Sequence, residues 1–210
     1  MKFLNFNKIL CISPHPDDVE YSMSATIKKY KDTTFDILCL SEGGDYDTTT
    51  STLRKAEVIK FWDGFDVTNV NLLFSNLKLI KDMTHDAWIN YIEYNILVDG
   101  HECIFVPSSN DSHFEHKFAN ELAHPLSRVK NLSIIEYRTP STLDTWIPNS
   151  FVDITEYSDE KFNQLSVFKS QSDKWYFKLE LLKSFHSNYQ SYKKNIKYVE
   201  KFKIMELYRI

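Results

Sequence analysis

Three short apolar runs, each followed by a polar loop, constrain most strongly what this chain can fold into. They are "KILCIS", "FDILCL" and "ECIFVP", and stretches with helical spacing lie between them. Runs this apolar are typical of central parallel strands that are covered on both faces. The alternation of strand and helix therefore predicts an α/β fold, a Rossmann-like, doubly wound and mostly parallel sheet with helices on both faces.

The rest of the chain continues this pattern and then changes it. Helices are predicted roughly over 19–30, 53–65 and 84–97, and after Glu115. The tail predicts two helices, within 150–171 and 174–185, and a final strand from Tyr198 onward at the sheet edge. Because no linker or repeat interrupts the sequence, we expect residues 1–210 to form a single domain.

Charge and apolar patterning narrow the class of partner. The chain has 25 Lys and Arg against 29 Asp and Glu, a net charge of -4, and the lysines are scattered among acids. This indicates a small-molecule partner and no nucleic acid.

The N-terminal apolar runs are too short for a signal peptide or a membrane span, so we expect a cytoplasmic protein. Three cysteines in strand-like runs predict buried thiols, and 15% aromatic residues make a homo-oligomer plausible.

Histidine and acid occur together after two of the three runs. "ILCIS" leads into "PHPDD", and "CIFVP" leads into "SSNDSHFEH". If the two strands are neighbours, both loops meet at the carboxyl edge of the sheet. His15, Asp18 and His116 would then supply two imidazole nitrogens and one carboxylate, a set that suits zinc and leaves a fourth position for water.

Adjacent acids in the first loop predict a division of labour. Neighbouring residues in an extended turn point in different directions, so Asp18 can bind metal while Asp17 takes a proton from the metal-bound water. The flanking prolines stiffen the loop.

The second loop carries two histidines one helical turn apart. His116 is the predicted ligand, and His113 would stabilise charge that develops on a substrate carbonyl oxygen. Glu115 is expected to hold His113 in one tautomer. Asp111 is expected to orient a ligand or to cap the helix.

Each feature also has a simpler interpretation. "HPDD" alone is compatible with a turn that caps a helix, and an isolated His-x-x-His is often surface decoration. The remaining histidines, at positions 85, 101, 124 and 186, are interpreted as structural or solvated. Tyr46, Trp146 and Trp175 offer flat rings on which a ligand could stack, although packing is the commoner role of such aromatics.

At "PHPDDVE" the chain resembles the PIG-L/LmbE family of zinc-dependent de-N-acetylases. The family hallmarks are an H-P-D-D loop after the first strand and a later H-x-x-H, and both are present in order. The resemblance continues through "TLRKAEV", "PNSFVDIT", "FKSQ" and "YVEKFKI". The chain departs from the family pattern at "YSMSAT", where many relatives have glycines, and at Glu115, where aspartate is usual.

The resemblance implies a metal-dependent hydrolase that removes acetyl from an N-acetylated hexosamine or glycoconjugate. His15, Asp18 and His116 would bind zinc or another divalent transition metal, Asp17 would be the general base, and His113 would stabilise the tetrahedral intermediate. Arg54 would lie near the substrate, or would be a surface partner of Glu57. The same chemistry on a non-sugar amide or ester, and a non-catalytic ligand-binding protein on this fold, remain as alternatives.

Overall fold

The computed structural model describes residues 1–43, 48–97, 100–189 and 195–208. Its seven strands form one sheet in the order β3-β2-β1-β4-β5-β7-β6. The strands are β1 Lys8–Ser13, β2 Thr34–Cys39, β3 Val70–Phe74, β4 Cys103–Pro107, β5 Ser133–Tyr137, β6 Ser150–Asp153 and β7 Val199–Glu206. The helices are α1 Asp18–Lys29, α2 Thr48–Gly64, α3 His85–Asn95, α4 Phe114–Glu121, α5 Ala123–Lys130, α6 Ser158–Gln164 and α7 Leu179–His186.

The first five strands are parallel, and their order reverses between β1 and β4. Ile9 of β1 pairs with Phe35 of β2 on one side and with Cys103 of β4 on the other. A reversal of this kind separates the loops that follow the two strands and opens a crevice at their carboxyl ends. The predicted doubly wound, mostly parallel sheet is confirmed, and the crevice lies where the two histidine-containing loops begin.

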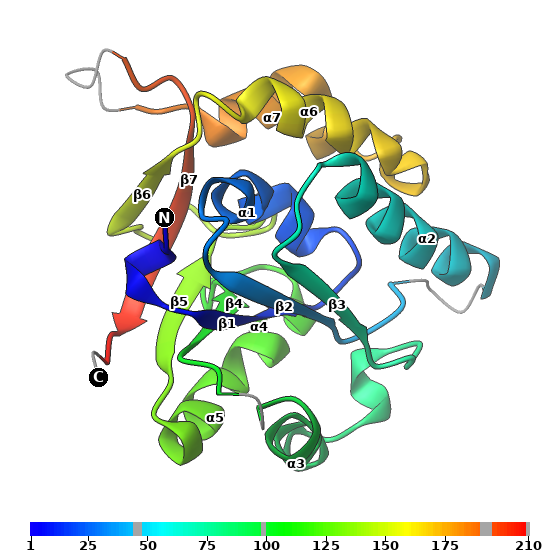
Figure 1. The fold of residues 1–210 in the computed structure, drawn as a ribbon. Helices are drawn as coiled ribbons and strands as arrows, with labels where there is room; N and C mark the ends of the chain where they lie inside the picture. Colours follow the sequence, from blue (N-terminus) through cyan, green and yellow to red (C-terminus); the bar gives the residue numbers. More distant parts are fainter. Residues whose placement is uncertain (44–47, 98–99, 190–194, 209–210) are drawn as a thin grey trace.

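Helices cover both faces of the sheet (Figure 1). Helices α1, α2, α6 and α7 pack on one face, and α3, α4 and α5 pack on the other. Alternate residues of β1 enter the two cores, Ile9 and Cys11 on the first face and Leu10 and Ile12 on the second. This period of two explains the unbroken apolar run, because both faces of a central strand are buried.

The tail differs from the prediction. The final strand β7 does not lie at the edge, because it inserts between β5 and β6 and pairs antiparallel with both. The edge strand on this side of the sheet is β6, which begins the segment 150–171 that was predicted to be helical. Helix α6 follows only at Ser158. Aromatic residues at irregular spacing in this segment fit a short strand and a helix equally well, so periodicity could not separate them.

Two further findings concern the cysteines and the membrane. Cys11, Cys39 and Cys103 are buried free thiols. None of the helices in the described part of the chain has the length and apolar character needed to cross a bilayer.

Candidate active site

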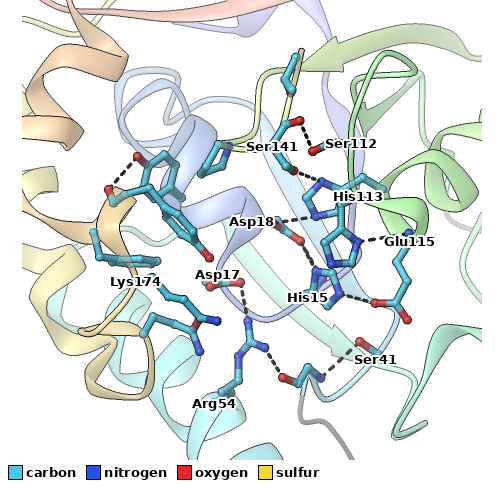
Figure 2. A pocket seen from close by; sticks show the side chains of 18 of the residues that line it. His15, Asp17, Asp18, Ser41, Arg54, Ser112, His113, Glu115, Ser141 and Lys174 are labelled. Atoms are coloured by element: carbon cyan, nitrogen blue, oxygen red, sulfur yellow. Dashed lines mark hydrogen bonds and ion pairs between the residues drawn. The ribbon is translucent and has the colours of Figure 1, made fainter.

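A pocket of about 950 Å³ opens at the carboxyl edge of the sheet. The loop after β1, the start of α4 and the loop after β5 line one part of it, and residues 170–171 and 174–177 line another. Figure 2 shows His15, His113 and Glu115 on one side, with Asp17 and Arg54 facing each other beside them. The structure therefore brings the two histidine-containing loops into one cavity, as their positions after neighbouring strands predict.

The first loop turns sharply so that its two acids diverge. Asp18 starts α1, and its Oδ2 accepts a hydrogen bond from the backbone N–H of His15 at 2.9 Å. The backbone N–H of Tyr21 donates to the carbonyl of Asp17, which closes the first turn of the helix. A carboxylate at this position is stabilised by the helix dipole.

Asp18 lies between two imidazoles. Its Oδ2 is 3.1 Å from Nδ1 of His15, and its Oδ1 is 3.4 Å from Nε2 of His116. One donor atom from each of the three side chains lies within 4.8 Å of the others. Two nitrogens and one oxygen at this separation match a three-residue site for a transition metal with an open fourth position.

Each of these imidazoles has a second carboxylate on its other nitrogen. Nδ1 of His116 is 3.2 Å from Oδ2 of Asp111. Nε2 of His15 is 2.6 Å from Oε2 of Glu115. Metal-binding histidines commonly have such a partner, because it fixes the ring and the position of its proton.

The charge balance of the site favours a cation. Burial by itself would lower the pKa of His116, but Asp18 and Asp111 outweigh burial and raise that pKa to about 10. Burial opposes the charged form of His15 in the same way, and hydrogen bonds to Asp18 and Glu115 raise its pKa. Carboxylates that pull protons onto two imidazoles would attract a divalent metal to the same place, so the residues fit a metal centre.

Asp17 lies outside this donor set and forms a buried ion pair. Its Oδ1 accepts from Nη2 of Arg54 at 2.8 Å, and Nη1 of Arg54 donates to the carbonyl of Gly43. Burial raises the pKa of Asp17 to about 6, Arg54 opposes the rise, and the neighbouring Asp18 adds to it. A carboxyl with a pKa in this range can exchange a proton near neutral pH.

The backbone conformation and the close neighbours of Gly43 require glycine at this position. Its φ is +65°, and a Cβ at this position would lie 2.6 Å from Cδ of Pro16 and 2.7 Å from Cζ of Arg54. Only glycine adopts this conformation without strain and leaves that space to its neighbours. The glycine thus allows the arginine to reach Asp17 from α2.

Arg54 is not a surface partner of Glu57. It is buried, with 8% of its surface exposed, and it lines the pocket. Glu57 instead accepts hydrogen bonds from the backbone N–H and the hydroxyl of Ser170. Helix α2 therefore contacts two parts of the site. Arg54 contacts the first loop, and Glu57 contacts Ser170 in the segment 170–177, which we call the far wall of the pocket.

His113 is held differently from the prediction. Its Nδ1 accepts from the backbone N–H of Glu115 at 3.3 Å, and the Glu115 carboxylate turns to His15. An N–H group can only donate, so the neutral His113 ring has its proton on Nε2. Burial and the nearby His15 and His116 lower the pKa of His113, which favours this neutral form.

Asp111 faces the proposed ligand His116, but it does not cap α4, because the N-cap residue of that helix is His113. Its Oδ1 accepts from the backbone N–H of His113 at the start of α4, while Oδ2 faces His116. Its pKa falls to about 2, because hydrogen bonds from His116 and neighbouring hydroxyls outweigh burial.

The prediction did not include Thr139 and Ser141, whose hydroxyls lie 3.2 and 3.1 Å from Nδ1 of His116. They follow β5, whose apolar run "SIIEY" was the signal that was missed.

The three aromatics considered for sugar stacking have different surroundings. Trp146 is buried, and its indole N–H donates to Glu136 at 2.7 Å. Trp175 lines the pocket and has 61% of its surface exposed. Tyr46 lies outside the described residues. Trp175 is therefore the one of the three that the structure shows at the pocket.

Comparison with known proteins relates this geometry to a family. The family model PIG-L, described as GlcNAc-PI de-N-acetylase, matches residues 10–126, which include both histidine-containing loops. A search of curated proteins found no match.

Solved structures share the fold at low sequence identity. N,N'-diacetylchitobiose deacetylase from Pyrococcus horikoshii is 23% identical, with a TM-score of 0.76 over 97% of this chain and 85% of that one. GalB, the 4-carboxy-2-hydroxymuconate hydratase from Pseudomonas putida KT2440, is 16% identical, with a TM-score of 0.70 over 100% of this chain and 98% of that one. The A40926 pseudoaglycone deacetylase Dbv21 is 14% identical, with a TM-score of 0.72 over 97% of this chain and 99% of that one.

Proposed function

The chain belongs to the PIG-L family of de-N-acetylases, and on this premise we propose that it is a zinc-dependent hydrolase that removes the acetyl group from an N-acetylated hexosamine. The observation that carries the proposal is a His15, Asp18 and His116 donor set beside a carboxylate, Asp17, that lies outside it. The presence of two deacetylases among proteins of the same fold supports a sugar amide as the substrate.

The three donors would hold the metal, and the remaining polar groups would move or stabilise charge. Zinc bound there supplies Lewis-acid chemistry, since it lowers the pKa of water and polarises an amide carbonyl. The same donors also accept other divalent transition metals, so metal identity is part of the test.

Asp17 acts as the general base. The Arg54 ion pair uses Oδ1 of Asp17 and leaves Oδ2 to accept a proton from the attacking water. Water adds to the carbonyl carbon, and the proton held by Asp17 passes to the amide nitrogen as the C–N bond breaks. The products are acetate and a free amine.

His113 stabilises the charge on the carbonyl oxygen. Because Nδ1 accepts from the backbone N–H of Glu115, Nε2 carries the proton that can be donated to this oxygen. A neutral ring suits this role, and burial favours the neutral ring.

The sugar and the group attached to it would occupy the wider pocket. Ser170, Gln171 and Lys174 offer polar contacts to hydroxyl groups along the far wall. The exposed indole of Trp175 offers a flat apolar face on which a sugar ring can stack.

The first test is the metal content of protein purified without added metal. We expect close to one zinc per chain, and loss of that zinc in His116→Ala. Full retention of metal in the variant would separate the two loops and remove the proposed donor set. Reloading the metal-free protein with zinc, cobalt, manganese or iron(II) then identifies the metals that support turnover.

The second test is acetate release from a panel of substrates. We expect release from N-acetylglucosamine derivatives and little from acetylated alkylamines or O-acetyl esters, which represent the non-sugar alternatives. The hydratase on the same fold makes water addition to an unsaturated acid a useful further member of the panel. Binding of an N-acetyl sugar without any acetate release would favour a non-catalytic binding protein.

A further inference from the structure

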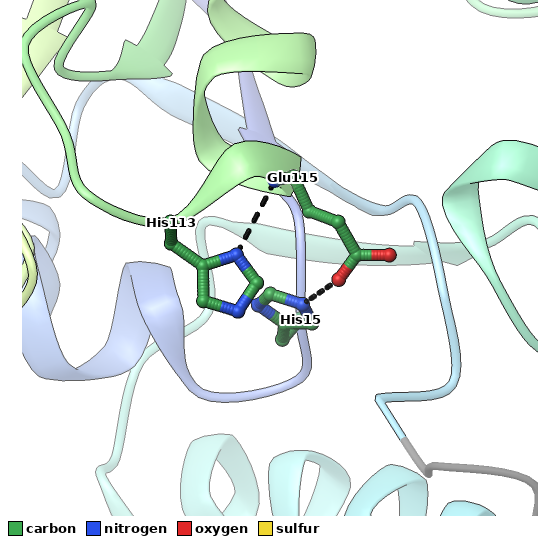
Figure 3. Close-up of side chains that lie close together, drawn as sticks. All are labelled: His15, His113 and Glu115. Carbon is green, nitrogen blue, oxygen red and sulfur yellow. Dashed lines mark hydrogen bonds and ion pairs between the residues drawn. The ribbon is translucent and has the colours of Figure 1, made fainter.

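Glu115 connects the two loops that form the site (Figure 3). Its Oε2 is 2.6 Å from Nε2 of His15, although the two residues are 100 positions apart in the sequence. The side chains are 12% and 13% exposed, so water screens the contact only weakly. Glu115 belongs to the first turn of α4, whereas His15 follows β1.

The geometry of His15 gives this contact a specific consequence. Its Nδ1 faces Asp18 at 3.1 Å, on the side where the metal donors converge, and its Nε2 faces Glu115. A neutral imidazole has one proton, so a metal on Nδ1 requires that proton to be on Nε2. A carboxylate that accepts from Nε2 stabilises this tautomer, fixes the ring and makes Nδ1 a stronger donor.

His116 shows the same arrangement in mirror form. Its Nε2 faces Asp18 and its Nδ1 faces Asp111. Each imidazole therefore has one nitrogen toward Asp18, which both rings share. The other nitrogen faces a carboxylate that contacts only that ring, Glu115 for His15 and Asp111 for His116. Asp111 comes from the same loop as His116, whereas Glu115 reaches across to the other loop.

We propose that Glu115 is a positioning residue for the metal, which acts by holding His15 as an Nδ1 donor. The inference rests on the proposed metal-dependent function and adds to it a chain-specific determinant of metal retention. The carboxylate does not touch the metal, and its charge acts through the His15 ring.

A competing possibility is that Glu115 is itself a metal ligand. His15, His113 and Glu115 also place one donor atom each within 4.8 Å of one another. Two hydrogen bonds oppose this possibility. Glu115 and His15 are already at hydrogen-bond distance, and Nδ1 of His113 accepts from the Glu115 backbone, which leaves its proton on Nε2. A metal at this position would have to break the first bond and change the His113 tautomer.

The experiment measures zinc release from the loaded protein into a colorimetric chelator. Glu115→Gln keeps the length of the side chain and removes its charge, and we expect zinc to leave at least about 10-fold faster than from the wild type. Glu115→Asp keeps the charge one methylene further away, so its release rate should be intermediate. Saturated Glu115→Gln should still bind as many zinc ions per chain as the wild type.

Glu121→Gln is the matched control. Glu121 is on the same helix, and its carboxylate is 2.9 Å from Nε2 of His85 in an exposed pair away from the pocket. This variant removes the same charge from a histidine contact and should release zinc at the wild-type rate.

The NMR chemical shift of the histidine ring N–H protons is a second measurement. A general loss of stability would not change the shift of one ring proton in the way expected here. In zinc-loaded wild type, the His15 Nε2 proton should be shifted downfield by the carboxylate, and it should move upfield in Glu115→Gln. An unchanged release rate and resonance in Glu115→Gln would overturn the inference while the metal and the activity of the wild type stand. Loss of one zinc per chain would make Glu115 a ligand and also overturn it. A wild type that binds no zinc would overturn the proposed function as well.

Discussion

Two clusters that contain a buried histidine and aspartate lie at opposite ends of β4. The amino-end cluster consists of Lys8, Asp36, Asn71 and His101, and Nε2 of His101 is 3.0 Å from Oδ2 of Asp36. The carboxyl-end cluster consists of His15, Asp17, Asp18 and His116, in which Asp18 contacts both imidazoles. The two clusters are similar in two respects. Their histidine-to-aspartate distances are 3.0 Å in the first and 3.1 and 3.4 Å in the second, and Asp36 and Asp18 are both buried.

Their surroundings differ. Asp36 also accepts from Asn71 at 2.7 Å and pairs with Lys8 at 3.1 Å, so a lysine and an amide of the protein itself balance its charge. None of these four residues lines the large pocket. The carboxyl-end cluster has a second imidazole, an additional carboxylate and a cavity. A buried pair of this type therefore indicates chemistry only when further donors converge on it from an open pocket.

The largest expected effect is in the carboxyl-end cluster. Asp17→Asn should lower kcat by about 1,000-fold, because the amide cannot accept a proton from water. Zinc content should stay near the wild-type value, since Asp17 is outside the donor set. Wild-type turnover in this variant would remove Asp17 from the mechanism and weaken the contrast between the clusters.

The next effect separates two roles of Arg54. Arg54→Gln removes the ion pair that orients Asp17, and we expect kcat to fall by up to about 100-fold with a small change in KM. Initial rates over a range of substrate concentrations give both constants. A large rise in KM at constant kcat would instead assign Arg54 to substrate binding.

In the amino-end cluster, the expected effect is on stability. Hydrogen bonds from His101, Asn71 and Lys8 outweigh burial and lower the pKa of Asp36 to about 2. Because the folded pKa is below the unfolded value, the stabilisation is present above about pH 4 and is lost as the pH falls toward 2. Asp36→Asn should lower the free energy of unfolding at pH 7 by about 2 kcal/mol and flatten its decrease over that acid range.

Urea denaturation at a series of pH values measures this effect, and kcat is measured on the same samples. Asp36→Asn should keep the turnover of the wild type under conditions where both proteins are folded. A large fall in kcat would contradict the assignment of the amino-end cluster to stability alone.

The smallest effect tests the pocket that distinguishes the carboxyl-end cluster. Trp175→Ala should raise KM for an N-acetyl sugar about 5-fold at nearly constant kcat, since one stacking contact contributes about 1 kcal/mol. Tyr94→Ala, a change at an aromatic residue that is 74% exposed, is the control and should leave KM unchanged. An unchanged KM in Trp175→Ala would place the substrate away from this wall.

The convergence of the two loops was predictable because it depends on strand direction. His15 and Asp18 follow one apolar run and His116 follows another, and parallel neighbours bring such ends to one edge. The contacts of Arg54 and Glu115 were not predictable in the same way. Their partners are 37 and 100 residues away, and no local pattern relates them.

The α/β pattern, the buried central strands and the residue types that follow β1 and β4 can all be predicted from the sequence. Local periodicity and apolar run length decide these features. Tertiary packing sets the position of β7 inside the sheet, the contact of Glu115 with His15 and the ion pair of Arg54 with Asp17. These contacts depend on how separate elements pack, and the packing of distant segments is a property of the whole chain.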